Sequence, residues 1–148
     1  MIVIDASVLA NVVGDDGPAG RAARNRIAAS TRWSAPDLVD VETVSVLRRR
    51  WRAGDLTARR FRSAVFDLVS LPIVRFPIGP LMVRAYELRS NLTPYDATYV
   101  ALAEGLSCAL VSADARLARA PGIHCHVDIL VFSPLELTAQ TRTDRSYV

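Results

Sequence analysis

The chain opens with a short apolar run that ends at an acidic residue. Ile2, Val3 and Ile4 are consecutive large apolar residues, and Asp5 follows them directly. A continuous apolar run of this length is typical of a strand that is buried on both faces of a sheet. From Ala6 onward the pattern becomes helical. We therefore expect a buried strand at residues 2–4, and a helical segment after it.

Prolines, glycines and small polar residues predict where the later helices begin and end. Asp37 and Thr57 are expected to cap the helices that follow them, and Gly54 and Gly105 to mark helix ends. We expect helices from Pro18 to about Ser30, from Asp37 to Gly54, from Thr57 to just before Pro72, from Pro80 to about Arg89, from Thr93 to Gly105 and, briefly, from Ala115 to Ala120.

Three further apolar runs lie between these helices, at residues 73–76, 109–111 and 123–127. Strands that alternate with helices imply parallel pairing with right-handed crossovers and helices on both faces of the sheet. The expected fold class is α/β: an α/β/α sandwich around a parallel sheet of four to five short strands. A length of 148 residues suits one such domain.

Composition narrows the class of protein. Hydrophobic residues make up 51% of the chain and charged residues 22%, which argues against a disordered chain or a coiled coil. The apolar opening lacks the basic flank and the length of a signal peptide, and later apolar runs are too short to span a membrane. We expect a cytoplasmic protein without membrane association. Cys108 and Cys125 fit buried, reduced thiols better than a disulfide framework.

The net charge is only +3, but all eighteen basic residues are arginine. Arginine suits phosphate contacts and base stacking, so the bias fits an RNA-binding protein. The codon usage of a GC-rich genome would produce the same bias, and it is the simpler explanation. The position of the arginines is more informative than their number. Seven of them lie within one stretch: Arg48, Arg49, Arg50, Arg52, Arg59, Arg60 and Arg62.

Four acidic residues stand where an active site is expected. Ligands of open parallel sheets bind beyond the carboxyl ends of the strands. Asp5 follows the first strand directly, and Asp114 follows the strand at 109–111 after two residues. Glu42 and Asp96 come from helices. Four gathered carboxylates repel one another unless a cation holds them, and such hard oxygen ligands suit Mg²⁺ or Mn²⁺. The chemistry that this predicts is metal-assisted hydrolysis of a phosphodiester.

Each acid also has an ordinary structural explanation. Asp5 could end a strand in a turn, and Asp96 could be a first-turn acid favoured by the helix dipole. Asp114 could cap the helix after it. Glu42 could be a neighbour of Arg49 on a solvated helix face. No single acid therefore identifies the site; their combination does.

His124, His126 and Asp128 alternate along the last expected strand and resemble the ligands of a zinc site. They would come from one strand near a sheet edge, which is a poor metal site. A metal-free ribonuclease would need two acid–base groups on opposite sides of the phosphate, and two histidines on one face of a strand do not provide this. The sequence also lacks a phosphate-binding P-loop and a nucleophile elbow.

Four segments carry a family resemblance: residues 1–9, 42–49, 92–104 and 110–118. They resemble PIN-domain ribonucleases, and most closely the VapC toxins of bacterial toxin–antitoxin pairs. The resemblance covers residues 1 to about 130. It implies that Asp5, Glu42, Asp96 and Asp114 are catalytic, and that Asp5, Asp96 and Asp114 bind the metal. We expect a nuclease domain at 1–131 and a C-terminal extension of unassigned role at 132–148.

Serines in these segments match positions that the family uses around the metal. Ser7 and Ser112 correspond to small hydroxyl residues, although threonine is usual at the position of Ser112. Ser45 stands where many relatives have asparagine. All three remain hydrogen-bonding side chains. We expect Ser7, Ser45, Ser112 and Arg49 to position the substrate.

The resemblance implies an endoribonuclease that uses Mg²⁺ or Mn²⁺, forms a homodimer and is silenced by a VapB-type antitoxin. Which RNA it cuts is not evident from the sequence. Two alternatives remain. One is a catalytically idle module that binds RNA or antitoxin, although all four acids are present. The other is a Mg²⁺-dependent phosphatase with Asp5 as nucleophile, although Ser7 stands where such enzymes usually have a second acid.

The helix that contains Glu42 carries two further features. Glu42 and Arg49 share a face, so the basic surface should begin near the metal site. Val41, Val44, Leu47 and Trp51 form an apolar stripe beside it. Most of this stripe should be core, because a helix of a sandwich buries one face. Trp51, between two arginines, is expected to be exposed and to anchor a partner or RNA.

Overall fold

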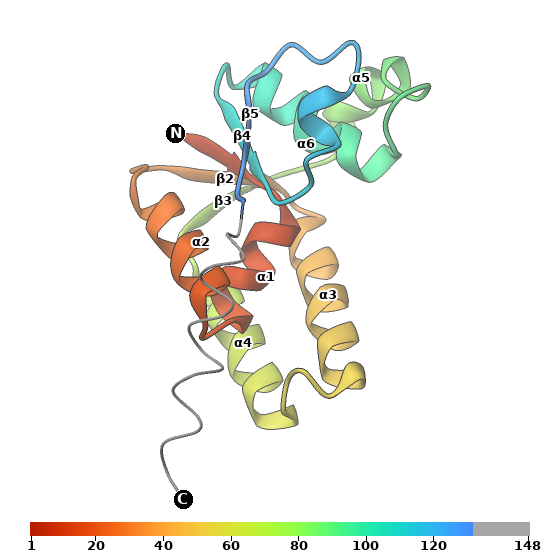
Figure 1. Ribbon diagram of the computed structural model, residues 1–148. Helices are drawn as coiled ribbons and strands as arrows, with labels where there is room; N and C mark the ends of the chain where they lie inside the picture. Colours follow the sequence, from red (N-terminus) through yellow and green to blue (C-terminus); the bar gives the residue numbers. More distant parts are fainter. Residues whose placement is uncertain (132–148) are drawn as a thin grey trace, which may run out of the picture.

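The computed structural model describes residues 1–131 and contains a sheet of five parallel strands in the order β3-β2-β1-β4-β5. The strands are β1 (Ile2–Ile4), β2 (Trp33–Pro36), β3 (Ile73–Phe76), β4 (Ala109–Ser112) and β5 (Val127–Ile129). Helices α5 and α6 lie on one side of the sheet and α1 to α4 on the other (Figure 1). The α/β/α class expected from the sequence is confirmed.

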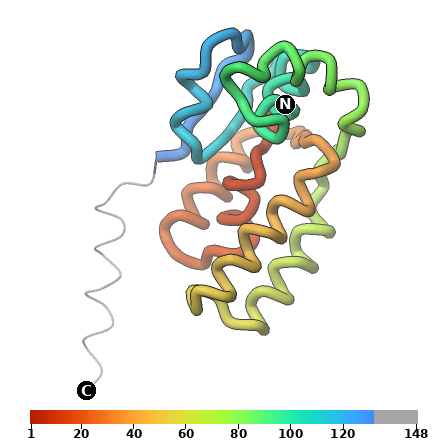
Figure 2. The backbone as a smooth tube through the Cα atoms, turned by 90° about the vertical axis from the view of Figure 1, so that its right-hand side faces the viewer, coloured from red at the N-terminus to blue at the C-terminus, as the bar shows by residue number. Residues whose placement is uncertain are grey.

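The helices follow the expected order along the chain. They are α1 (Ala6–Gly14), α2 (Pro18–Ala28), α3 (Val39–Ala53), α4 (Ala58–Ser70), α5 (Met82–Glu87) and α6 (Pro94–Gly105). Thr57 and Thr93 cap α4 and α6, since each side chain accepts a hydrogen bond from a backbone N–H of the first turn. Gly54 ends α3 with a φ of 85°, which favours glycine. Helices α3 and α4 then run side by side (Figure 2).

Strand β2 was missed by the sequence analysis. Its four residues include Pro36 and show no clear alternation, yet they pair with β1 and β3. The strand delays the next helix: α3 begins at Val39, and Leu38 occupies its N-cap position. The predicted cap at Asp37 is therefore wrong, because the backbone N–H of Asp37 instead donates to the carbonyl of Phe76 in the neighbouring strand, at 2.8 Å.

The last strand was predicted too early along the chain. β5 covers Val127–Ile129, so only the final residue of the predicted strand 123–127 belongs to it. His124 and His126 precede β5 and do not alternate along it with Asp128. The short helix predicted at 115–120 is reduced to a 3-10 turn at Leu117–Arg119. Both errors fall in the connection between β4 and the edge strand, where the apolar signal is weak.

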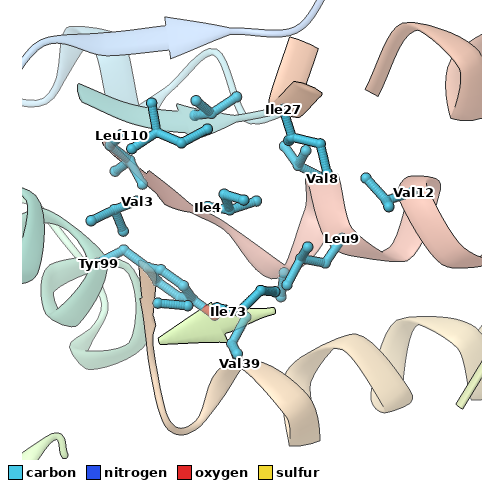
Figure 3. Close-up of a cluster of buried hydrophobic side chains, with 14 of the residues drawn as sticks. Val3, Ile4, Val8, Leu9, Val12, Ile27, Val39, Ile73, Tyr99 and Leu110 are labelled. Carbon is cyan, nitrogen blue, oxygen red and sulfur yellow. The ribbon is translucent and has the colours of Figure 1, made fainter. Parts of the chain in front are cut away.

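The core explains why β1 is continuously apolar. Val3 and Ile4 are fully buried in the centre of the sheet, with α1 on one face and α6 on the other. Figure 3 shows them between Val8 and Leu9 of α1 and Tyr99 of α6. A strand covered on both faces needs large apolar residues throughout. No helix within residues 1–131 is long and apolar enough to cross a membrane.

The apolar stripe on α3 is only half core. Leu47 is fully buried and Val44 packs against the core, but Val41 is 72% exposed. The prediction that most of the stripe is buried is therefore wrong for Val41. Trp51 is 44% exposed, as expected, and its ring lies 6.1 Å from that of Phe61 on α4.

Candidate active site

The four predicted acids line one pocket at the carboxyl end of the central strands. Asp5 caps α1 directly after β1, and Asp114 lies two residues beyond β4. Glu42 reaches the pocket from α3 and Asp96 from the first turn of α6. The pocket has a volume of about 430 Å³. The geometry brings together acids that are separated by up to 109 positions in the sequence.

Two serine hydroxyl groups hold the carboxylate of Asp5. The hydroxyl of Ser112 donates to Asp5 Oδ2 at 2.6 Å, and that of Ser7 donates to the same oxygen at 2.9 Å. Each serine oxygen also accepts a backbone N–H: Ser7 from Ala113 at 3.1 Å and Ser112 from Asp114 at 3.0 Å. The two serines thus tie the end of β1 to the end of β4, and they fix one oxygen of Asp5.

The environment of Asp5 disfavours its charged form. Burial raises the pKa of this carboxyl, and the nearby charge of Asp96 raises it further. The hydrogen bonds from Ser112 and Ser7 act in the opposite direction but do not cancel the effect of burial. Asp5 is therefore an acid that would gain from a neighbouring positive charge.

Glu42 is half-buried and is held by a residue that the sequence analysis did not identify. The hydroxyl of Tyr99, on α6, donates to Glu42 Oε2 at 2.6 Å. Burial raises the pKa of Glu42, and the charges of Asp5 and Asp96 add to this, while the Tyr99 hydrogen bond opposes it. Burial raises the pKa of Tyr99, and its hydrogen bond to Glu42 raises it further. Tyr99 therefore links the core to the site.

Asp96 forms a reciprocal pair with the residue that caps its own helix. The hydroxyl of Thr93 donates to Asp96 Oδ2 at 2.9 Å and accepts the backbone N–H of Asp96 at 3.2 Å. The backbone bond to Thr93 is the N-cap bond of α6, and the hydroxyl bond holds the carboxylate of Asp96 against its own helix start. The prediction that Thr93 begins a helix was correct, but its second role, orienting Asp96, was not foreseen.

Asp114 differs from the other three acids because it has a cationic partner. The guanidinium of Arg116 reaches Asp114 Oδ2 at 2.6 Å and Oδ1 at 3.0 Å, and its hydrogen bond lowers the pKa of Asp114. The side chain of Arg116 is 90% exposed. An exposed ion pair of this kind is weak and is easily exchanged for another cation.

The donor chemistry of the pocket fits a hard divalent cation. As the side chains stand, no three acids, histidines or cysteines within residues 1–131 are close enough to ligate one ion. Asp5, Glu42 and Asp96 nevertheless offer only oxygen donors. Burial raises the pKa values of Asp5 and Glu42, and repulsion from neighbouring acids adds to this effect. Mg²⁺ and Mn²⁺ prefer such carboxylate ligands and would relieve this repulsion.

The predicted positioning residues are also present in or beside the pocket. Ser7, Ser45 and Arg49 line it together with the acids, and Ser112 contacts Asp5 from below the pocket surface. Glu42, Ser45 and Arg49 follow one face of α3, so the basic stretch does begin beside the carboxylates. Tyr95 also lines the pocket, although the sequence analysis did not identify it.

His124 and His126 line a different pocket, together with Cys108 and Cys125. That pocket includes Ala109, which begins β4, whereas the acids lie beyond the other end of this strand. The histidines are therefore remote from the four acids. Asp128 is paired with Arg26. The two cysteines are free but partly exposed, which corrects the expectation that they are buried.

Comparison with known proteins agrees with this architecture. The PIN domain family matches residues 2–123. Ribonuclease VapC9 of Mycobacterium tuberculosis is 40% identical over 130 residues, which is 88% of this chain and 98% of the relative. Ribonuclease VapC12 of the same species is 36% identical over 130 residues, covering 88% of this chain and 99% of the relative.

Solved structures share the fold at lower identity. The crystal structure of Mycobacterium tuberculosis VapC20, described as a sarcin–ricin loop cleaving toxin, superposes with a TM-score of 0.66 at 18% identity, over 84% of this chain and 97% of that one. The structure of VapBC2 from Rickettsia felis, bound to a promoter DNA fragment, superposes with a TM-score of 0.62 at 13% identity. The match covers 88% of this chain and 100% of that one. The chain therefore belongs to the PIN-domain family, and within it to the VapC ribonucleases.

Proposed function

We infer that this protein is the toxin of a type II toxin–antitoxin pair and acts as a Mg²⁺- or Mn²⁺-dependent endoribonuclease. The observation that carries this proposal is the pocket itself, in which four carboxylates from four parts of the chain meet beside Arg49. Such a site suits the hydrolysis of a phosphodiester bond. The family relationship supports RNA as the substrate. We propose a cytoplasmic location, because a toxin that acts on the RNA of its own cell meets its substrate there.

We assign the metal to Asp5, Asp96 and Asp114. When bound, the ion supplies an activated water and offsets negative charge on the phosphate. Asp5 is suited to this role because Ser7 and Ser112 fix its orientation. Arg116 must leave Asp114 for that carboxylate to serve as a ligand.

The remaining residues of the pocket act on the water and the substrate. Glu42, with its raised pKa, is suited to accept a proton from the attacking water. Arg49 offers a guanidinium to the phosphate, and Ser45, one turn earlier on α3, offers a hydroxyl. The serines Ser7 and Ser112 position the substrate through Asp5.

The partner assignment rests on relatives. Structural neighbours are described as a toxin–antitoxin complex from Klebsiella pneumoniae and as VapBC2 from Rickettsia felis. For this chain we propose a VapB-type antitoxin and a homodimer.

The test is to incubate the purified protein with total cellular RNA in Mg²⁺ or in EDTA and to map the new ends. Cleavage should require the metal and leave 5′-phosphate and 3′-hydroxyl ends, because the attacking oxygen comes from water. Ends that carry 2′,3′-cyclic phosphate would contradict the proposal.

Parallel reactions test the alternatives. Single-stranded DNA and a chromogenic phosphomonoester should remain intact while RNA is cut. Hydrolysis of the phosphomonoester alone would favour a phosphatase, and a chain inactive on all three would favour an idle binding module. Neither alternative has support in the pocket: Ser7 is bonded to Asp5 where a phosphatase would have its second acid, and all four acids are present.

A further inference from the structure

Tyr95 is an exposed aromatic residue at the mouth of the acidic pocket. Its side chain is 60% exposed, and it lines the pocket beside Asp96. Tyr99, one helical turn later on α6, is 1% exposed and hydrogen-bonded to Glu42. The two tyrosines therefore differ in role: Tyr99 supports an acid from the core, while Tyr95 presents its ring to the solvent where a substrate would enter.

A second exposed apolar residue lines the same pocket from another element. Val41, on α3, is 72% exposed and directly precedes Glu42. Isolated exposed apolar residues are common and need no explanation. Here two of them, from α3 and α6, flank the acids of one pocket, so an apolar surface adjoins a strongly acidic one.

This combination matches the two parts of a nucleotide. The phosphate requires the charged groups, while a nucleobase is flat, apolar on its faces and attached close to the phosphate. Because Tyr95 and Asp96 line the same pocket, a base next to a phosphate held near Asp96 lies within reach of the ring. Aromatic side chains stack on bases that are unpaired, since a paired base is already covered by its neighbours.

We propose that Tyr95 and Val41 form a base-binding subsite, in which the ring of Tyr95 stacks on an unpaired RNA base adjacent to the bond that is cut. This inference rests on the proposed ribonuclease function and adds to it a specific contact: Tyr95 and Val41 bind a base while the carboxylates act on the adjacent phosphate. Stacking tolerates any base, so the subsite selects unpaired structure before it selects sequence.

The first test compares the variants Tyr95→Ala, Tyr95→Phe and Tyr86→Ala. Tyr86, on α5, is also exposed, at 64%, but does not line the pocket, and it serves as the matched control. The probe is a short labelled oligoribonucleotide that spans the main cut mapped in total RNA. Tyr95→Ala should raise KM roughly tenfold or more with little change in kcat, as expected for one lost base stack. Tyr95→Phe and Tyr86→Ala should behave as wild type.

The second test removes the base and keeps the backbone. An abasic nucleotide is placed at each position around the cut, and wild type and Tyr95→Ala are compared on every substrate. At one position beside the cut, the abasic nucleotide should strongly reduce cleavage by wild type and hardly reduce cleavage by Tyr95→Ala. The reason is that the abasic nucleotide and the alanine substitution remove the same contact. If the abasic nucleotide reduced cleavage by wild type and by Tyr95→Ala equally at every position, the proposal would be overturned. An unchanged KM for Tyr95→Ala would overturn it as well.

Failure of this inference is distinguishable from failure of the proposed function. If wild type cuts RNA and Tyr95→Ala matches it in both tests, the function stands and the subsite is wrong; the ring would then be available to a protein partner. If wild type cuts no RNA, binding of the same oligonucleotide is measured by fluorescence anisotropy in EDTA. A weaker complex for Tyr95→Ala than for Tyr86→Ala would still support stacking, and equal complexes would reject it.

Discussion

The carboxylate of Asp5 is held in a fixed orientation, although its environment disfavours the negative charge when no cation is bound. It accepts two serine hydroxyl groups, yet burial and the charge of Asp96 raise its pKa. The hydrogen bonds orient the group, and the unfavourable charge gives it affinity for a cation. Orientation and cation affinity thus have separate structural sources.

Asp5→Asn should abolish cleavage and leave the fold intact. Asparagine can still accept both hydroxyl groups through its carbonyl oxygen, and it loses only the long contact, at 3.4 Å, from the backbone N–H of Ser7 to the other oxygen. The variant loses one proposed metal ligand, and we expect activity to fall by about a hundredfold or more, as for other electrostatic groups of active sites. Circular dichroism and RNA cleavage measure the two effects. A variant that unfolds early but cuts RNA at the wild-type rate would show that Asp5 is structural.

The pH dependence of stability gives an independent check on Asp5. Because its pKa is raised on folding, its contribution to stability is complete below the ordinary carboxyl pKa of about 4 and is lost as the pH rises through the raised pKa. In EDTA, the stability of Asp5→Asn relative to wild type should therefore increase with pH and then level off. Urea unfolding across a pH series measures this difference. A difference that is constant with pH would contradict the burial effect.

Tyr99→Phe should reduce stability and change the pKa of Glu42. Loss of the hydroxyl removes the hydrogen bond to Glu42 and should cost about 1 kcal/mol of stability. The bond lowers the pKa of Glu42, so its removal should raise that pKa. The acidic limb of the pH–rate profile should then move to higher pH. Tyr86→Phe is the control, and an unshifted acidic limb in Tyr99→Phe would show that Glu42 does not limit the rate.

Among the elements, some were predictable from sequence and others were not. Helices α4 and α6 carry threonine caps and long apolar patterns, so their starts were predicted correctly. Strand β2 gives no comparable signal, because it is only four residues long and mixes apolar and polar residues. It forms a strand through its pairing with β1 and β3. β5 lies at the sheet edge with intermediate burial, so its limits depend on its pairing with β4. Pairing between distant segments is not encoded locally.

Thr57 and Thr93 both cap helices, but only Thr93 also bonds to the carboxylate of a proposed active-site residue, Asp96. Thr57 and Thr93 are both exposed and accept a backbone N–H at 3.1 and 3.2 Å. Each change to alanine should destabilise the protein by about 1 kcal/mol. Only Thr93→Ala should also lower kcat, because Thr93 orients Asp96. Thr93→Ser should restore both properties. Equal kcat values for the two alanine variants would limit Thr93 to a capping role.

For the whole molecule, the location of the site was predictable because topology determines it. Parallel strands present their carboxyl ends at one edge, so Asp5 and Asp114 had to approach each other once the sheet was correct. The contacts of each acid were not predictable in the same way. Tyr99 looks like an ordinary core residue in the sequence, and the pairing of Arg116 with Asp114 depends on the turn after β4.

The arginine-rich stretch contains two side chains that bond to neighbouring elements and five that are exposed. Arg50 donates to Asn11 Oδ1 at 2.6 Å, and Arg60 pairs with Asp16 at 2.8 Å, so these two support the packing of neighbouring elements. The remaining five are exposed: Arg48, Arg49, Arg52, Arg59 and Arg62. Helices α3 and α4 pack against each other, and we call these five exposed side chains the basic surface; of the five, Arg49 lines the pocket.

Replacing Arg49, Arg52 and Arg59 together with glutamine should reduce the salt dependence of RNA binding. Each lost phosphate contact lowers the slope of log affinity against log salt by about 0.7 for a single strand, so three contacts lower it by about 2. The control replaces Arg21, Arg32 and Arg89, which are exposed outside α3 and α4, and changes the net charge equally. RNA binding, RNA cleavage and antitoxin binding are measured separately across a salt series. If both triple variants show the same slope, net charge alone attracts the RNA and the position of the basic surface is irrelevant.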